Sequence, residues 1–74
     1  MTLDQLKPGE SARVVEIGGD DEAAERLMEM GLVEDTPLQV VRFAPLGDPI
    51  EIVARGYHLT IRKAEAAQIV IEKI

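Results

Sequence analysis

Apolar and polar residues alternate in the middle of the chain, over residues 37–43 and again over residues 50–61. A period of two is typical of β-strands that bury one face. If Arg55-Gly56 forms a two-residue turn, the second stretch is a hairpin. Its apolar residues would then oppose one another in three pairs on one face, Ile50 with Ile61, Ile52 with Leu59, and Ala54 with Tyr57.

A three-residue loop would instead place Ile52 opposite Thr60, so the pattern favours the even loop. The other face of the hairpin would be solvated and would bring Glu51 into diagonal reach of Arg62. His58 and Thr60 would share that polar face.

Residues 11–17 predict a first strand with Ala12 and Val14 facing the core. Val15 and Ile17 fall on the opposite parity. This mismatch indicates either a bulge or burial on both faces of the strand.

The two ends of the chain also contain apolar residues. Residues 3–10 hold paired leucines followed by Pro-Gly, which predicts a packed lead-in and a tight turn. Residues 63–67 predict a short helical turn, and residues 68–74 a last strand with Ile69 and Ile71 pointing inward.

A helix is predicted over residues 21–30. Acidic residues at positions 20–22 suit the exposed N–H groups of a helix start, and Gly31 suits a left-handed position just past its end, with Leu32 folding back. The apolar stripe consists of Ala24, Leu27 and Met28. Core packing is favoured over metal ligation for Met28 and Met30.

The order is therefore strand, helix, three strands, helical turn, strand. This order predicts a mainly β fold, a small, partly open SH3-like barrel of about five strands with one inserted α-helix and a short helical turn before the last strand. The 74 residues would form one domain, residues 1–74. An open barrel edge could pair weakly between copies.

Composition narrows the possible functions. The chain has no cysteine, which excludes disulfides and thiolate metal sites, and no apolar run approaches the ~18 residues that span a bilayer. No signal peptide is evident at the start, so we expect a soluble, cytoplasmic protein without direct membrane insertion. Residues 1–36 carry three basic and ten acidic side chains, a net charge of −7, which argues against binding to nucleic acid.

Catalytic motifs are absent from the sequence. Ser11 is the only serine and His58 the only histidine, and nothing in their context predicts a catalytic triad. One Phe and one Tyr, with no Trp, do not provide an aromatic groove for proline-rich peptides. The sequence predicts neither an enzyme nor a cofactor site, and an adaptor or regulatory module that binds a protein remains.

Three residues could lie together at the end of the hairpin and hold a divalent ion, Asp48, Glu51 and His58. A typical catalytic iron site uses two histidines and a carboxylate, and this chain has one histidine. The sequence therefore predicts no dedicated iron or zinc site, and these three residues stand as the candidates for a metal-sensing alternative.

The segment between the second and third strands is the candidate partner-binding site, Ala44, Pro45, Leu46, Gly47, Asp48 and Pro49. Two prolines and a glycine make it a stiff connection with Leu46 at its tip, longer than a plain hairpin requires. Leu46 would be an apolar anchor and Asp48 a polar residue that fixes the turn. A rigid structural corner and a docking surface are both open interpretations.

Four segments of the chain are distinctive: Leu6-Lys7-Pro8-Gly9-Glu10, the helix and its exit from Arg26 to Leu32, residues 40–50, and residues 59–66. Together they resemble the FeoA family of ferrous-iron transport accessory proteins. The Ala-Pro-Leu-Gly-Asp-Pro stretch is the most specific of these matches. The resemblance implies an SH3-like barrel in the cytoplasm that regulates or assembles FeoB, a membrane ferrous-iron transporter with a cytosolic GTP-binding domain.

Two features qualify the resemblance. Where the family commonly has Pro-Gly after the helix exit, this chain has Glu34-Asp35, and Asp adopts a left-handed turn less readily than Gly. The helix also carries an acidic outer face.

Similar domains occur at the C-terminus of DtxR-type repressors, so a divalent-metal-responsive domain is the alternative. Because Met1 directly precedes the module, we expect a free-standing accessory protein.

Overall fold

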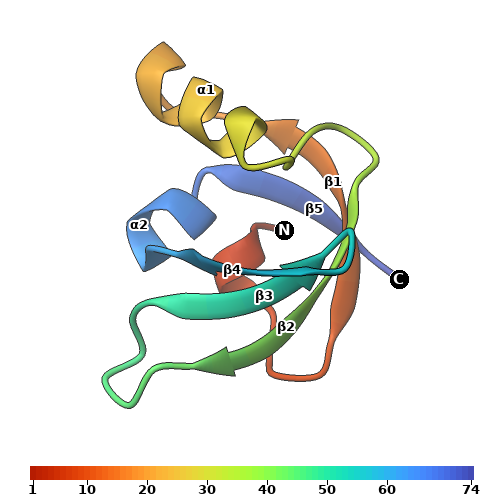
Figure 1. Ribbon diagram of the computed structural model, residues 1–74, viewed down its shortest axis with the longest axis vertical. Coiled ribbons are helices and arrows are strands. Elements are labelled where there is room, and N and C mark those ends of the chain that lie inside the picture. Colours follow the sequence, from red (N-terminus) through yellow and green to blue (C-terminus); the bar gives the residue numbers. More distant parts are fainter.

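The computed structural model describes residues 1–74 and contains one five-stranded sheet. Its strands are β1 (Ser11–Ile17), β2 (Pro37–Phe43), β3 (Ile50–Ala54), β4 (Tyr57–Ile61) and β5 (Ile69–Lys73). They are antiparallel and lie in the order β4-β3-β2-β1-β5. The sheet curls around a common interior (Figure 1), which confirms the predicted small, partly open barrel.

Three short helical segments accompany this sheet. η1 (Leu3–Gln5) lies within its curve, α1 (Asp21–Glu29) lies beyond one end of the barrel, and α2 (Lys63–Ala66) links β4 to β5 on the open side (Figure 1). η1 contacts both α2 and β5. No helix is both long and apolar enough to cross a membrane.

The core is aliphatic and continuous. Fifteen buried residues form one cluster, and both leucines of the predicted lead-in, Leu3 and Leu6, belong to it. Burying each large aliphatic side chain stabilises a fold by roughly 1.5–3 kcal/mol. The inward positions predicted for Ile69 and Ile71 are also confirmed, since both residues are buried.

The β3–β4 hairpin has the predicted register, with Ile50 opposite Ile61 and Ile52 opposite Leu59. Its two turn residues have positive φ, 55° at Arg55 and 81° at Gly56, as a two-residue hairpin turn requires. Tyr57 is the exception among the paired apolar residues. It begins the edge strand β4, which pairs with β3 alone, and remains 72% exposed.

The register of β1 shifts between Val14 and Glu16, which confirms a bulge at the parity mismatch. Val15, the extra residue, is exposed, and Ile17 returns to a half-buried position against the core. The outer edge of β5 is partly covered, because Thr2 forms a bridge with Val70.

The helix α1 begins as predicted, with Asp20 Oδ1 accepting a hydrogen bond from the Ala23 N–H at 2.7 Å. It ends at a left-handed Gly31 (φ 96°), where the Leu32 N–H donates to the Leu27 carbonyl at 3.1 Å. The expectation that Met28 packs in the core is wrong. Met28 is 48% exposed because it lies at the margin of the apolar stripe, whereas Leu27 is buried.

The turn after α1 accommodates the Glu34-Asp35 departure. Asp35 adopts the left-handed conformation at φ 68°, and its N–H donates to the Val14 carbonyl at 2.8 Å. Thr36, next in the chain, is buried, and its hydroxyl accepts a hydrogen bond from the Val33 N–H at 3.2 Å. The turn therefore keeps a left-handed conformation with an aspartate at this position, where a glycine would adopt it without strain.

Candidate functional site: the β2–β3 loop

The loop of Ala44–Pro49 is closed at its base by the backbone. The Ala44 N–H donates to the Pro49 carbonyl at 3.0 Å, directly beyond the paired residues Phe43 and Ile50. A second bond runs from the Gly47 N–H to the Ala44 carbonyl at 2.7 Å, and Gly47 has φ 86°. These bonds define the turn that leads into and out of the tip, and a glycine suits its positive φ.

Leu46 at the tip is 97% exposed. It therefore makes no contribution to the core of its own barrel, and the structural-corner interpretation does not account for this side chain. A leucine in water leaves unused roughly 1.5–3 kcal/mol of burial free energy. The loop thus presents an apolar group that a partner could bury.

Asp48 connects the loop to a different element. Its Oδ1 accepts a hydrogen bond from the backbone N–H of Lys63, the first residue of α2, at 2.9 Å. A carboxylate is a good acceptor for an unpaired N–H at a helix start. Asp48 therefore attaches the β2–β3 loop to the segment that follows β4, a role the sequence predicted only as fixing the turn.

A depression of about 370 Å³ lies beside the loop. It is lined by Arg42, Phe43, Ala44, Pro45, Pro49, Glu51 and Thr60. Phe43 is half-buried and Thr60 is exposed. Sequence reasoning did not assign Arg42, Phe43 or Thr60 to the site, although residues on the strands next to a candidate loop are obvious neighbours.

Glu51 contacts two basic side chains on the outer face of the sheet. Its Oε1 accepts a hydrogen bond from Arg42 Nε at 2.9 Å, and its Oε2 lies 3.0 Å from His58 Nδ1. The bond from Arg42, then the one from His58, holds the pKa of Glu51 below its ordinary value. The expected diagonal contact with Arg62 is absent, because Arg42 lies directly opposite Glu51 across β2 and β3.

The three metal candidates do not assemble into one site. Glu51 and His58 lie together, but the carboxylate of Asp48 is bonded to the Lys63 N–H. No group of three His, Cys, Asp or Glu side chains has the geometry to hold a metal ion. The structure thus brings together two of the three predicted ligands.

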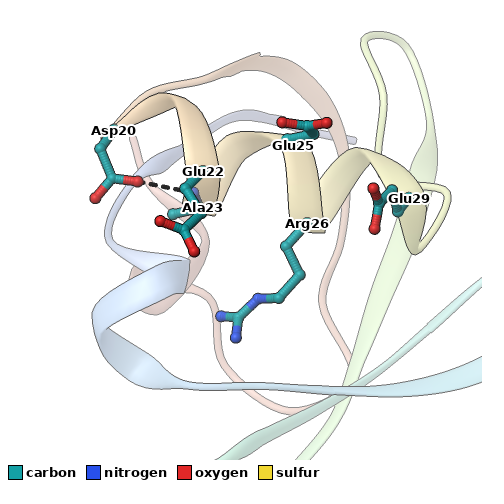
Figure 2. A pocket seen from close by; sticks show the side chains of 6 residues that line it. All are labelled: Asp20, Glu22, Ala23, Glu25, Arg26 and Glu29. Atoms are coloured by element: carbon teal, nitrogen blue, oxygen red, sulfur yellow. Dashed lines mark hydrogen bonds between the residues drawn. The ribbon is translucent and has the colours of Figure 1, made fainter.

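A second hollow, about 430 Å³, lies along the outer side of α1. Figure 2 shows the residues that line it, Asp20, Glu22, Ala23, Glu25, Arg26 and Glu29. Arg26 extends toward α2, where it forms an ion pair with Glu65, and Glu25 lies on the other side of the helix (Figure 2). The hollow is a carboxylate-rich helix surface and contains no catalytic grouping.

The chain matches the protein family described as FeoA domain over residues 1–73. A curated relative, the Fe(2+) transport protein A/Fe(2+) transporter FeoB fusion protein of Porphyromonas gingivalis, is 35% identical over 74 residues. That match covers 100% of this chain and 9% of the relative, so the chain spans less than a tenth of the fusion protein.

Solved structures agree with this match. The FeoA protein from Chlorobium tepidum is 43% identical with a TM-score of 0.94, over 100% of this chain and 70% of that one. Stenotrophomonas maltophilia FeoA complexed with zinc, described as a prokaryotic SH3 domain protein, is 29% identical with a TM-score of 0.84, over 97% and 89%. The manganese regulator SloR, at 19% identity and a TM-score of 0.86 over 100% of this chain and 34% of that one, shares the fold.

Proposed function

Because this chain belongs to the FeoA domain family, we propose that it acts in ferrous iron transport as an accessory protein that binds a FeoB-type transporter. The fusion relative supports this proposal, since its name joins a transport protein A and a FeoB transporter in one chain. In such a fusion, the tether raises the effective concentration of one part for the other.

The surface we propose for this contact is the loop of Ala44–Pro49. The observation that carries the proposal is the full exposure of Leu46 on a loop that is bonded at its base and through Asp48. A preorganised loop loses little conformational entropy on binding, so more of the burial free energy of its apolar anchor is available as affinity. Interfaces commonly depend on a few such anchors.

The transporter contact would take place at the cytoplasmic face of the membrane, and the protein would be cytoplasmic. Its net charge of −6 does not favour adhesion to anionic lipid or to nucleic acid, so a protein partner fits this surface best. The role is regulatory, without catalysis by the chain itself.

The metal-responsive alternative has less support. No group of three His, Cys, Asp or Glu side chains supports it, and the likeness to manganese regulators, at 16–19% identity, concerns the fold alone.

Co-purification tests the proposal. The tagged protein and its Leu46→Glu variant are passed over membranes that contain the transporter, with and without GTP, and iron uptake is measured in cells that carry each form. We expect the variant to remain folded, to fail to co-purify with the transporter and to support less iron uptake. A folded variant that retains both would contradict the docking role of the loop.

A further inference from the structure

A depression of about 470 Å³ lies where the end of α1 meets β1, and the β2–β3 loop takes no part in it. It is lined by three apolar residues and two acidic ones, Ile17, Met28, Val33, Glu16 and Glu34. These five residues are called the α1–β1 patch.

The apolar part of this patch is accessible to solvent. Met28 is 48% and Val33 36% exposed, and Ile17 is half-buried against the core. Met28 lies about 100° around the helix from the buried Leu27, so its side chain reaches the surface at the margin of the core face. A methionine in an exposed apolar depression is suited to packing against partners of varied shape.

The acidic rim of the patch is not neutralised within the chain. Glu16 and Glu34 take part in no ion pair, and neither does Glu25, which precedes Met28 by three residues and therefore lies on the same side of α1. In contrast, the other glutamates on the sheet face and near α2 each have a basic partner, Glu10, Glu51, Glu65 and Glu72.

Two of the three basic residues near the patch are paired with other glutamates. Arg26, on the other side of α1 from Glu25 (Figure 2), pairs with Glu65 of α2. Arg13 of β1 pairs with Glu72. The third, Arg55, forms no ion pair; it lies close to Gly31, beyond the helix end, and does not line the depression. The depression therefore combines an apolar floor with uncompensated negative charge.

We propose that the α1–β1 patch is a second docking surface, which binds a cationic amphipathic segment of a protein partner. The apolar side chains of that segment would cover Ile17, Met28 and Val33, and its Lys or Arg residues would meet Glu16 and Glu34. A two-fold symmetric contact between this patch and that of a second copy fits poorly, because it would bring the same carboxylates together. The inference goes beyond the proposed function, since the patch and the Leu46 loop consist of different residues.

The probe for this surface is a synthetic peptide of leucine and lysine at the spacing of an amphipathic helix, titrated into ¹⁵N-labelled protein. We expect the backbone signals of Ile17, Met28 and Val33 to shift. A scrambled peptide of identical composition, which has the same charge but no apolar face, should bind at least about tenfold more weakly, equivalent to about 1.4 kcal/mol.

Two variants with the same change in net charge provide the decisive comparison. Glu34→Lys, in the patch, should lower the affinity for the peptide at least about fivefold. Glu22→Lys, about 120° around α1 from Met28, should change this affinity less than twofold. Met28→Gln should also lower the affinity for the peptide, without changing the net charge of the protein. Equal effects of both reversals, equal binding of the scrambled peptide, or patch signals that shift with protein concentration alone would overturn the proposal.

Discussion

The carboxylate of Asp48 accepts a hydrogen bond at 2.9 Å from the backbone N–H of Lys63, fifteen residues further along the chain. This bond joins the β2–β3 loop to the start of α2, so that two connections of the barrel support each other. The exposed Leu46 is thereby presented from a loop held both at its base and near its tip.

Replacement of Asp48 by alanine should therefore loosen the loop. We expect the free energy of unfolding to fall by about 1 kcal/mol, as for loss of a side-chain bond to a helix-terminal N–H. Backbone ¹⁵N relaxation should show increased motion at residues 45–47. Asp48→Asn, which keeps an acceptor oxygen, serves as the control and should lie close to the wild type. An alanine variant with unchanged stability and unchanged relaxation would contradict this role.

The interaction of Glu51 with Arg42 and His58 should appear as a dependence of stability on pH. The pKa of Glu51 in the folded protein lies below its ordinary value of 4.5, chiefly because of the bond from Arg42. Its stabilising contribution is therefore present above pH 4.5 and is lost as the pH falls through the lowered pKa.

Urea unfolding of the wild type and Glu51→Gln at pH 7 and pH 3 measures this effect. The wild type should be the more stable form at pH 7, and the difference should shrink at pH 3. The unpaired Glu16, replaced by Gln, is the control and should show a smaller change between the two pH values. A Glu51→Gln difference that is the same at both pH values would exclude the ion pair as its source.

The exposure of Met28 predicts a sharp contrast with its neighbour Leu27. Leu27→Ala should destabilise the protein by about 2–5 kcal/mol, because it leaves a cavity in the core. Met28→Ala should cost less than about 1 kcal/mol. Thermal unfolding of the two variants measures both, and similar losses would show that Met28 packs in the core after all.

The left-handed Asp35 predicts an opposite result for two small substitutions. Asp35→Gly should stabilise the fold by up to about 1 kcal/mol, since glycine adopts φ 68° without a steric penalty. Asp35→Ala should instead destabilise it, because alanine has neither that freedom nor a short polar side chain. Chemical denaturation distinguishes them, and the reverse order would contradict the strain assigned to this turn.

Local patterns in the sequence were sufficient to predict much of the fold. The hairpin register follows from its period of two and its even loop, and the bulge of β1 follows from the parity mismatch at Val15. The acidic start of α1 and the glycine at its end likewise predicted both termini within one residue.

What the sequence did not predict depends on contacts between distant segments. Glu51 pairs with Arg42 and not with Arg62, because an irregularity between Val40 and Arg42 sets the β2–β3 register. Asp48 forms no metal-binding group with Glu51 and His58, and its carboxylate bonds to the start of α2, a contact that no local pattern shows. The α1–β1 patch also requires the packing of two elements to be known.

The most direct test of the account is the affinity of the purified protein for a FeoB-type transporter in lipid nanodiscs. Wild type, Leu46→Glu and Tyr57→Glu are compared by equilibrium titration, with and without GTP. Tyr57, 72% exposed at the opposite end of the β3–β4 hairpin, is the matched control for placing a charge on an apolar surface residue. We predict that Leu46→Glu weakens binding at least about tenfold while Tyr57→Glu remains within about twofold of the wild type. Wild-type affinity in a folded Leu46→Glu variant would contradict the account.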